Sequence, residues 1–396
     1  MLEGLRVVEL ATYIAAPGAA GIMADWGAEV IKVESPEGDP MRRFFDTIGS
    51  DQDANPVFEL DNRGKKAVML DIRSDLGREA LKALVATADI FLTNVRPAAL
   101  ARAGLDYEAL KAVNPRLIYC SLTGYGLTGP DRDKPGMDVA AFWSRAGVGS
   151  ITAPKGTEPF PIRTGMGDHV TSLATVSAIL AAVYERTVTG VGRLVETSLL
   201  RAGVYAIGSD MAIQLRFGKL ASTRGRRETV QPLANFYKTL DGRWICLLPR
   251  QGSVDWPRIA AAAGRPELVD DPRFVSAKNR REHGQALVDI LDAAFGAMTY
   301  DEAAEALDAG DITWAPYQTP RELATDAQAL AAGCFVETPD GAGGTFKAPA
   351  APARFPGARD GPRGPAPKLG ADTASVFKAL GWDEAKVAAL TKVSAA

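Results

Sequence analysis

Short apolar runs alternate with helical patterns along the first third of the chain. The apolar runs, at residues 5–10, 29–34, 67–72, 89–94 and 117–122, have the length of buried strands. Small or amphipathic segments with helical spacing separate them, most regularly at residues 75–87. Strand, helix and strand within about thirty residues form a βαβ unit. The pattern therefore predicts an α/β fold with a parallel sheet covered by helices.

A glycine-rich turn, residues 163–169, precedes a long apolar helical pattern at residues 170–186. Asp168 stands where this turn would lead into the helix, near unpaired N–H groups and the positive end of the dipole, which should keep it ionised. Gly165 and Gly167 lack a Cβ, so a ligand could approach the backbone closely. Aspartate is also a favoured helix N-cap, and capping is the simpler explanation of this residue from local sequence alone. His169 is expected to be a first-turn helix residue that points elsewhere.

The second half of the chain predicts a smaller α+β unit. A polar, basic segment at 218–231 has the composition of an interdomain connection. Residues 236–248 predict a hairpin with Asp241-Gly242 as its two-residue turn. Helical patterns follow at 256–263, 284–298 and 300–307. The Pro/Gly/Ala-rich stretch 337–367 has no clear periodicity, so we expect it to wrap over an existing surface before a last helix at 383–390.

Chain length favours two domains, because 396 residues are too many for one ordinary core. A hydrophobic content of 46% and a charged content of 23% are typical of a globular protein. The predicted organisation is a large domain at 1–200, a linker at 201–232, a small domain at 233–318 and a return segment at 319–396 that completes the large domain.

Composition excludes several classes of function. The net charge of −3 argues against nucleic-acid binding. No stretch of about 18 uncharged apolar residues and no basic leader is present, so we expect a cytoplasmic protein without membrane contact. Three widely spaced cysteines and only two histidines, His169 and His283, argue against a disulfide framework and a metal site.

Basic residues gather in or near loops beside the predicted strand ends. Any one of them alone is typical of a solvated surface charge. Together they suit a polyphosphate ligand, since arginine binds phosphate through two hydrogen bonds and lysine supplies point charge. Ligands of open α/β sheets bind at the carboxyl ends of strands, where such loops lie. The residues are Arg42, Arg43, Arg63, Lys65, Lys66, Arg96 and Arg102.

A nucleotide-dependent dehydrogenase is the rival interpretation of the first βαβ unit. Glu34 ends the second predicted strand, where a ribose-binding acid would stand. The preceding turn reads Ala15-Ala-Pro-Gly18-Ala-Ala-Gly21 and lacks the G-x-G-x-x-G motif. The dehydrogenase interpretation is therefore weak.

A series of short motifs, in order along nearly the whole chain, resembles the class III CoA-transferases, such as formyl-CoA and carnitine CoA-transferases, and the related α-methylacyl-CoA racemases. The resemblance implies a Rossmann-like large domain built from both chain ends, a smaller domain between, and two subunits interlocked as a homodimer. The motifs are Gly4-Leu-Arg-Val-Val-Glu-Leu10, Ala15-Ala-Pro-Gly18, Trp26-Gly-Ala-Glu-Val-Ile-Lys-Val-Glu34, Gly38-Asp-Pro-Met-Arg42, Asn62-Arg-Gly-Lys-Lys66, Asn94-Val-Arg-Pro97, Asn114-Pro-Arg-Leu-Ile118, Gly124-Tyr-Gly126, Gly167-Asp168, Thr189-Gly-Val-Gly192, Asp271-Pro-Arg-Phe274 and Pro316-Tyr-Gln-Thr-Pro320.

The resemblance implies a covalent transferase in which Asp168 attacks the thioester of an acyl-CoA. A mixed anhydride and then an aspartyl-CoA thioester follow, and a small carboxylic acid accepts the CoA. CoA is then a substrate, with no permanently bound cofactor. The residues matching the family's CoA site are Arg42, Lys65, Lys66, Asn94, Arg96, Arg102 and Tyr125, with the choice between Lys65 and Lys66 open.

Two alternatives stay open within this resemblance. The racemases pair the aspartate with a histidine that precedes another aspartate, but the matching run here is Gly136-Met137-Asp138, and methionine cannot exchange a proton. A non-catalytic acyl-CoA-binding relative is the other alternative. Phe142-Trp143 resembles transferases of larger or aromatic acids, and the run 248–253 lacks the multi-glycine loop of oxalate-using members. Donor and acceptor stay unidentified.

Overall fold

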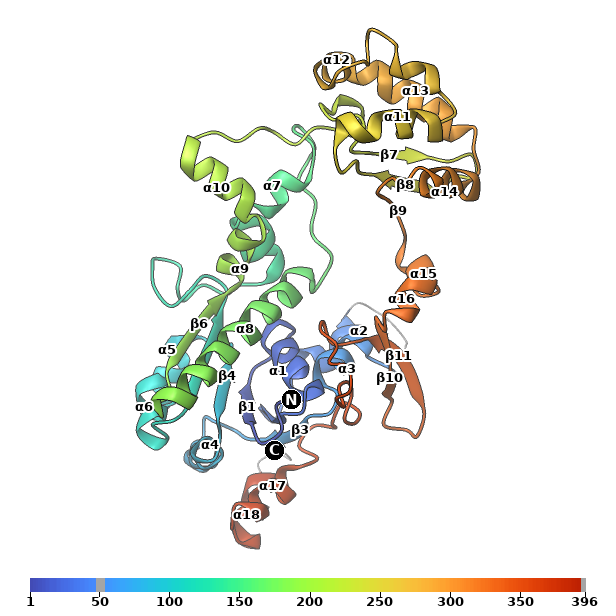
Figure 1. Ribbon diagram of the computed structural model, residues 1–396. Coiled ribbons are helices and arrows are strands. Elements are labelled where there is room, and N and C mark those ends of the chain that lie inside the picture. The colour runs from blue at the N-terminus through green and yellow to red at the C-terminus, as the bar shows by residue number, and fades with distance from the viewer. Residues whose placement is uncertain (48–53, 393–396) are drawn as a thin grey trace. The chain divides into compact units, whose positions relative to one another are not determined.

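A six-stranded parallel sheet forms the centre of the larger of two units (Figure 1). The computed structural model describes residues 1–47 and 54–392. The larger unit comprises residues 1–150, 159–220 and 332–396. The strand order is β3-β2-β1-β4-β5-β6, and every neighbouring pair is parallel. The strands are β1 (Arg6–Leu10), β2 (Glu29–Glu34), β3 (Lys66–Met69), β4 (Ile90–Thr93), β5 (Ile118–Thr123) and β6 (Leu194–Ser198).

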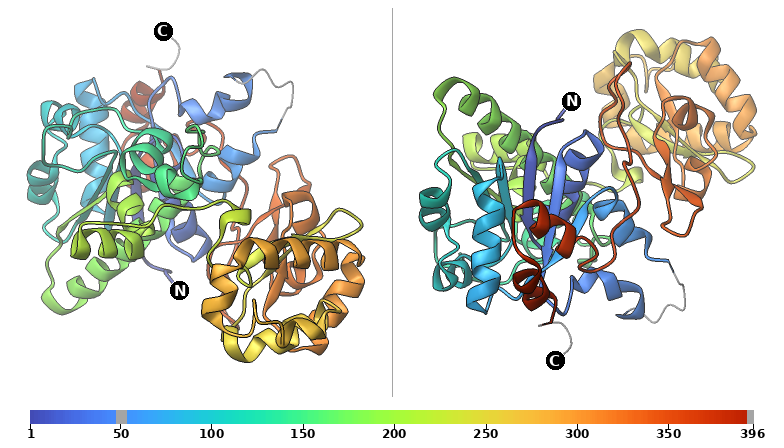
Figure 2. Two further views of the ribbon diagram at one scale, coloured as in Figure 1. Left: turned by 90° about the horizontal axis from the view of Figure 1, so that it is seen from above. Right: turned by 90° about the horizontal axis from the view of Figure 1, so that it is seen from below.

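Helices cover both faces of this sheet, which confirms the predicted α/β class. Consecutive residues of β1 point to opposite faces: Val7 packs with α1 (Ala15–Asp25) and α8 (Met166–Thr189), whereas Val8 packs on the other face. The second face is covered by α4 (Asp75–Ala86), α6 (Tyr107–Val113), α17 (Thr373–Ala379) and α18 (Glu384–Lys392). The C-terminal helices, dark red in Figure 2, thus complete the core begun by the N-terminal strands. Burial on both faces explains why these strands are almost continuously apolar.

Helices α1 and α8 pack unusually closely. A Cβ on Gly18 of α1 would lie 2.8 Å from the Ser172 Oγ of α8. Ser172 Oγ also donates to the carbonyl of Ala15 at 2.6 Å. In the described part of the chain, α8 is the one helix long and apolar enough to cross a membrane, and it is the helix that packs on α1 and the sheet.

The remaining helices of the larger unit lie in its connections. Two of them occupy much of the predicted linker at 201–232, so the regular structure of this unit continues to Phe217. They are α2 (Phe44–Thr47), α3 (Pro56–Asn62), α5 (Pro97–Ala103), a π-helix (Asp138–Arg145), α7 (Val148–Thr152), α9 (Leu199–Ala206) and α10 (Gly208–Phe217).

The smaller unit, residues 151–158 and 221–331, contains a three-stranded antiparallel sheet. The predicted hairpin is confirmed, but its loop is longer than two residues because Thr239 N donates to Arg243 O, which leaves 240–242 as the loop. Gly242 supplies the positive φ of 84° that this three-residue loop requires. The elements are β7 (Asn235–Lys238), β8 (Trp244–Leu247), α11 (Gly252–Ala262), α12 (Ala277–Glu282), α13 (Gly284–Gly296), α14 (Tyr300–Ala309), β9 (Trp314–Pro316), α15 (Pro320–Leu323) and α16 (Ala327–Ala331).

The Pro/Gly/Ala-rich segment contains a hairpin that the sequence did not predict. Strands β10 (Phe335–Pro339) and β11 (Thr345–Pro349) pair antiparallel within the larger unit. Arg63, buried after α3, donates to Thr338 Oγ1 at 3.2 Å and to the carbonyl of Pro349 at 3.0 Å, and pairs with Asp25 at 2.6 Å. Its guanidinium therefore anchors this hairpin and is not available as a phosphate-binding cation.

A buried cluster of four charges joins the carboxyl-terminal parts of β1 and β2 to the loops beyond them. Lys32 Nζ contacts Glu9 Oε1 at 2.9 Å and Asp39 Oδ2 at 2.8 Å, and Lys65 Nζ contacts Glu9 Oε2 at 2.6 Å. The side chains of Glu9, Lys32 and Lys65 are fully buried. Burial alone would raise the pKa of Glu9, but the two lysines hold it below its usual value.

We predict that Lys32→Met lowers the free energy of unfolding by about 3–5 kcal/mol, because Asp39 and one oxygen of Glu9 would be left buried without a counter-charge. Lys66→Met is the matched control, since this lysine of β3 is 49% exposed and pairs with Glu29 at the surface. The control should lose less than about 1 kcal/mol. Urea denaturation of both variants checks this, and equal losses would contradict it.

Candidate active site

A cavity of about 580 Å³ opens at the carboxyl ends of four strands of the parallel sheet. Thr12 and Tyr13 follow β1, and Asn94 and Arg96 follow β4, the strand beside it. The strand order reverses between β1 and β4, which is where open α/β sheets bind their ligands. The remaining lining residues are Ile14, Ala15, Met41, Phe44, Pro97, Leu122, Thr123, Gly124, Arg132, Lys134, Pro135, Gly136, Met137, Asp138, Thr164, Asp168 and Leu199.

Asp168 lies in the first turn of α8 and lines this cavity. It is not the helix N-cap: Gly165 holds that position with a φ of 88° and makes no side-chain capping bond. Within residues 1–47 and 54–392, no group donates a hydrogen bond to the Asp168 carboxylate. The capping interpretation of Asp168 is therefore wrong, and its carboxylate is available to a ligand.

The π-helix Asp138–Arg145 holds the start of α8 in place. Asp138 Oδ2 accepts a hydrogen bond from Gly165 N at 2.9 Å, and its Oδ1 accepts one from Val139 N at 2.7 Å. A Cβ on Gly167 would lie 2.6 Å from Phe142 Cγ, so only glycine permits this approach of the two helices. Phe142 and Trp143 are both buried, and neither lines the cavity.

The environment of Asp168 opposes ionisation. Burial, the nearby Asp138 carboxylate and, less strongly, Asp61 raise the pKa of Asp168 to about 7, although the neighbouring His169 lowers it. We expected the helix N–H groups and dipole to keep this carboxylate ionised. Removal from water and a like charge outweigh that influence, so Asp168 titrates near neutral pH.

His169 faces a second cavity, of about 330 Å³, so the expectation that it points away from Asp168 is confirmed. Its Nε2 lies 3.1 Å from Oδ1 of Asp61, near the end of α3. The hydrogen bond to the Asp61 carboxylate is the main cause of the raised pKa of His169. Leu173 of α8 and residues 349–352, from the last residue of β11 onward, form further walls of this second cavity.

Two of the predicted CoA-binding residues line the main cavity. Arg96 is exposed at the beginning of α5. Asn94 fixes the loops after β1 and β4 to one another, since its Oδ1 accepts from Thr12 N at 3.1 Å and its Nδ2 donates to Thr12 O at 2.7 Å.

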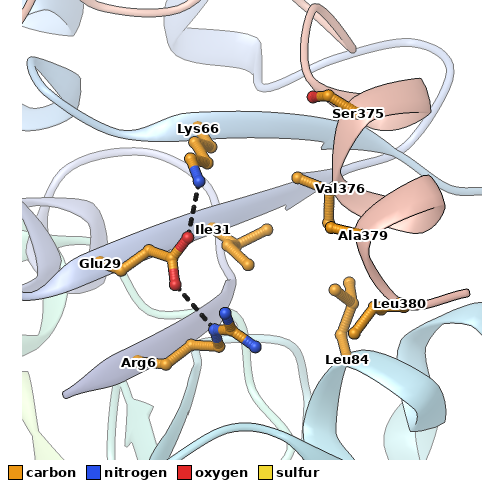
Figure 3. A pocket seen from close by; sticks show the side chains of 9 residues that line it. All are labelled: Arg6, Glu29, Ile31, Lys66, Leu84, Ser375, Val376, Ala379 and Leu380. Atoms are coloured by element: carbon orange, nitrogen blue, oxygen red, sulfur yellow. Dashed lines mark hydrogen bonds and ion pairs between the residues drawn. The ribbon is translucent and has the colours of Figure 1, made fainter. Parts of the chain in front are cut away.

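Three other predicted residues have different partners and do not line this cavity. Arg42 donates twice to Glu34, at 2.7 Å each, and once to the carbonyl of Pro367, and Lys65 belongs to the buried charge cluster. Lys66 is the first residue of β3 and lies at the amino ends of the strands, at the other end of the sheet from the cavity. There it shares a small pocket with Arg6 and Glu29 (Figure 3). Their predicted contact with CoA therefore finds no support in the structure. The pairing with Arg42 also occupies Glu34, the acid that would bind ribose in a dehydrogenase.

Arg102 and Tyr125 lie near the cavity in sequence but are not among its lining residues. Arg102 is exposed in the last turn of α5, five positions beyond the cavity-lining Pro97. Tyr125 packs against the core, with the guanidinium of Arg145 5.8 Å from its ring centroid.

Several residues that line the cavity were not predicted from the sequence. Arg132 and Lys134 add positive charge from the loop after β5. Tyr13 and Phe44 contribute aromatic walls, and Tyr13 has the strained φ of 67° that is rare outside glycine. The charged run 131–134 after the glycine-rich loop was an available signal for the basic residues. No sequence signal marked the backbone of Tyr13. Among the described residues, no cluster of three or more His, Cys, Asp or Glu could hold a metal ion.

Comparisons with known proteins identify the family of this chain. The family model of CoA-transferase family III matches residues 2–373. The chain is 37% identical over 389 residues to the (R)-2-hydroxy-4-methylpentanoate CoA-transferase of Clostridioides difficile, covering 98% of this chain and 97% of the relative. It is 35% identical over 396 residues to the cinnamoyl-CoA:phenyllactate CoA-transferase of Clostridium sporogenes, covering 99% and 96%.

The fold agrees as well. The crystal structure of a CaiB/BaiF family protein from Brucella suis superimposes with a TM-score of 0.84 at 30% identity, covering 96% of this chain and 99% of that one. The resemblance seen in the sequence motifs is therefore confirmed. This chain belongs to CoA-transferase family III.

Proposed function

We propose that the protein moves CoA from an acyl-CoA thioester to a free carboxylic acid, with Asp168 as the nucleophile. One observation carries this proposal. Asp168 lies in the first turn of α8 without capping the helix, and it lines the cavity at the carboxyl ends of the strands. The family membership supports the reaction class. A non-catalytic role is disfavoured because the relatives named above are transferases.

The proposed reaction is a series of nucleophilic attacks that transfers CoA from one acid to the other. Asp168 attacks the thioester carbonyl, the C–S bond breaks, and an acyl-aspartyl anhydride and CoA thiolate form. The thiolate attacks the aspartyl carbonyl, which releases the first acid and leaves an aspartyl-CoA thioester. The acceptor carboxylate attacks that thioester, the C–S bond breaks, and a second anhydride and CoA thiolate form. CoA thiolate then attacks its acyl carbonyl, giving the new acyl-CoA and free Asp168.

Each attack creates an oxyanion that needs hydrogen-bond donors. The first N–H groups of a helix have no intrahelical acceptor, and Asp168 belongs to the first turn of α8. Met166 N donates to Arg163 O and His169 N to Gly165 O. We therefore assign the N–H groups of Gly167 and Asp168 to the oxyanion, where the positive end of the helix dipole adds to their effect.

The cations of the cavity suit the phosphates of CoA. Arg96, Arg132 and Lys134 line the cavity, and the side chain of Lys134 pairs only with Asp131 on its own loop, at 2.5 Å, among the described residues. Arginine can bind phosphate through two parallel hydrogen bonds. We therefore place the CoA phosphates at Arg96 and the 132–134 loop.

The acid partner should carry an apolar side chain. Tyr13, Ile14, Phe44 and Met137 give the cavity an apolar wall beside Asp168. The names of the two relatives above include 2-hydroxy acids with branched or aromatic side chains. By this analogy we propose a 2-hydroxy acid with a bulky apolar substituent as donor or acceptor acid.

The racemase alternative lacks its second acid/base group. Met137 occupies the position of the racemase histidine and lines the cavity next to Asp138. Its thioether cannot accept or return an α-proton. His169 does not replace it, because its ring faces the second cavity.

We also propose the interlocked homodimer that the sequence resemblance implies. Large apolar side chains stand largely exposed along α8, α9 and α10, and a surface of this kind marks a protein interface. They include Tyr184, Val188, Tyr205, Leu215 and Phe217.

Replacing the nucleophile separates chemistry from stability. Asp168→Asn should lower transfer by about a thousandfold or more, because an amide cannot form the anhydride. Its thermal unfolding at pH 8 should not occur at a lower temperature. The raised pKa of Asp168 means that ionisation costs the folded state stability as pH rises, and asparagine avoids that cost. Hydroxylamine should inactivate the wild type only with acyl-CoA present. A well-folded Asn variant with normal transfer would exclude Asp168 as nucleophile.

Arg96, the N-cap of α5, and Arg102, in its last turn, offer a matched test of CoA binding. Arg96→Ala should raise the KM for acyl-CoA about tenfold with kcat little changed, since a phosphate contact is uniform binding energy. Arg102→Ala should change the KM less than about twofold, because this residue does not line the cavity. Steady-state kinetics gives the KM for acyl-CoA of both variants. A larger rise in Arg102→Ala than in Arg96→Ala would place the CoA phosphates at the end of α5 instead.

Heavy water distinguishes transferase from racemase. With a 2-methylacyl-CoA and a bulky 2-hydroxy acid, mass spectrometry should detect the new hydroxyacyl-CoA. Without the acid, no deuterium should enter the α-position of the thioester. Rapid exchange in the absence of an acceptor would instead favour the racemase.

Light scattering tests the dimer. The protein should elute with twice the chain mass of 41.9 kDa and keep that mass on dilution to nanomolar concentration. A stable species of a single chain mass would argue against interlocked subunits.

A further inference from the structure

Three carboxylates and one histidine surround the first turn of α8. Asp168 belongs to this turn, Asp138 binds the backbone just before it, and Asp61 reaches it from α3. His169 is the one titratable base that contacts this group in the described ranges 1–47 and 54–392. When His169 is protonated, its positive charge therefore offsets the repulsion among the carboxylates.

Asp61 needs a positive partner, and His169 is placed to be that partner. The Asp61 side chain is only 4% exposed, and the sole side-chain hydrogen bond it makes within the described residues is the one to His169 Nε2 at 3.1 Å. A buried carboxylate without a counter-charge is costly. Nearby cations make their hydrogen bonds elsewhere: Arg63 pairs with Asp25, and Lys65 donates to Glu9, Pro17 O and Asn62. Lys65 attracts Asp61 only at longer range, without a hydrogen bond.

The ring of His169 is fixed but remains accessible to protons. It packs beside α1 and the turn before α8, with Cδ2 3.5 Å from the Cβ position of Gly18 and Cε1 3.6 Å from that of Gly165. Its side chain is 45% exposed, on the side of the second cavity. Asp61 thus favours the imidazolium while solvent supplies the proton.

We propose that His169, held protonated by Asp61, is a positioning residue that keeps the Asp168 carboxylate ionised against the repulsion of Asp138. This inference rests on the proposed role of Asp168 as nucleophile. It gives a function to a histidine that the reaction itself does not use.

The directions of the electrostatic effects agree with the proposal. The Asp61 hydrogen bond raises the pKa of His169, despite burial, and His169 is the group that lowers the pKa of Asp168. The remaining charges act oppositely: Asp138 and Asp61 both raise the pKa of Asp168. The benefit is confined to neutral and acidic pH, because at alkaline pH Asp168 is ionised without help and His169 is neutral.

The pH profile of kcat/KM tests the role of His169. His169→Gln keeps a hydrogen-bond donor for Asp61 but loses the charge, so the acidic limb should move up by about one pH unit. Activity should then fall about tenfold at pH 6 and less than about twofold at pH 8.5. His169→Arg, which keeps the charge, should restore the wild-type limb. His283→Gln removes the other histidine of the chain, in the smaller unit, and should leave the profile unchanged.

An equal loss of activity at every pH would mean a purely structural role for His169, and an unchanged profile would mean none; either result overturns the proposal. Two histidines give a simple NMR titration that does not depend on activity, with His283→Gln providing the assignment. The pKa of His169 should exceed its ordinary value of about 6.5 and fall in Asp61→Asn. A wild-type value at or below 6.5 would overturn the proposal.

The two proposals fail in different ways. If Asp168→Asn abolishes transfer while His169→Gln keeps the wild-type profile, only the role of His169 is refuted. If Asp168→Asn stays active, the nucleophile assignment falls first, whatever the histidine variants show.

Discussion

The buried pairing of Lys32 with Glu9 and Asp39 fixes the loop that forms one wall of the cavity. Asp39 uses one oxygen for Lys32, and its other oxygen accepts hydrogen bonds from the backbone N–H groups of Tyr13 and Met41, at 3.0 Å each. Both of these residues line the cavity. The strained backbone of Tyr13 persists because a fully buried ion pair holds its N–H group in position.

The same cluster is linked to Asp168 through two helices. Lys65 donates to the carbonyl of Pro17 in α1 at 2.9 Å, and the carbonyl of Ala15 in α1 accepts from Ser172 in α8 at 2.6 Å. Asp138 fixes the other side of the first turn of α8. The position of Asp168 is therefore determined from both sides by buried polar groups, each of which would be costly to leave unpaired.

Sequence periodicity was sufficient for the first five strands of the sheet, because a buried strand is a local pattern. The role proposed for Asp168 came instead from the family resemblance, since local sequence alone favoured a helix cap. Periodicity could not assign the cations. Lys65 and Arg96 look alike in a sequence, as basic residues beside strand ends, yet Lys65 is buried against Glu9 and Arg96 lines the cavity. The β10–β11 hairpin escaped prediction because its anchor, Arg63, lies far away in the chain. The raised pKa of Asp168 likewise depends on burial and on the nearby Asp138, both of which arise only on folding.

The backbone around Asp138 is held independently of the side chain at position 137. Asp138 is bound through backbone N–H groups, and the carbonyl of Met137 accepts from Ala141 N at 2.8 Å, so neither contact involves the Met137 side chain. That side chain is about half exposed at the cavity. A substitution at position 137 therefore changes the chemistry of the cavity wall without disturbing the backbone that holds the first turn of α8.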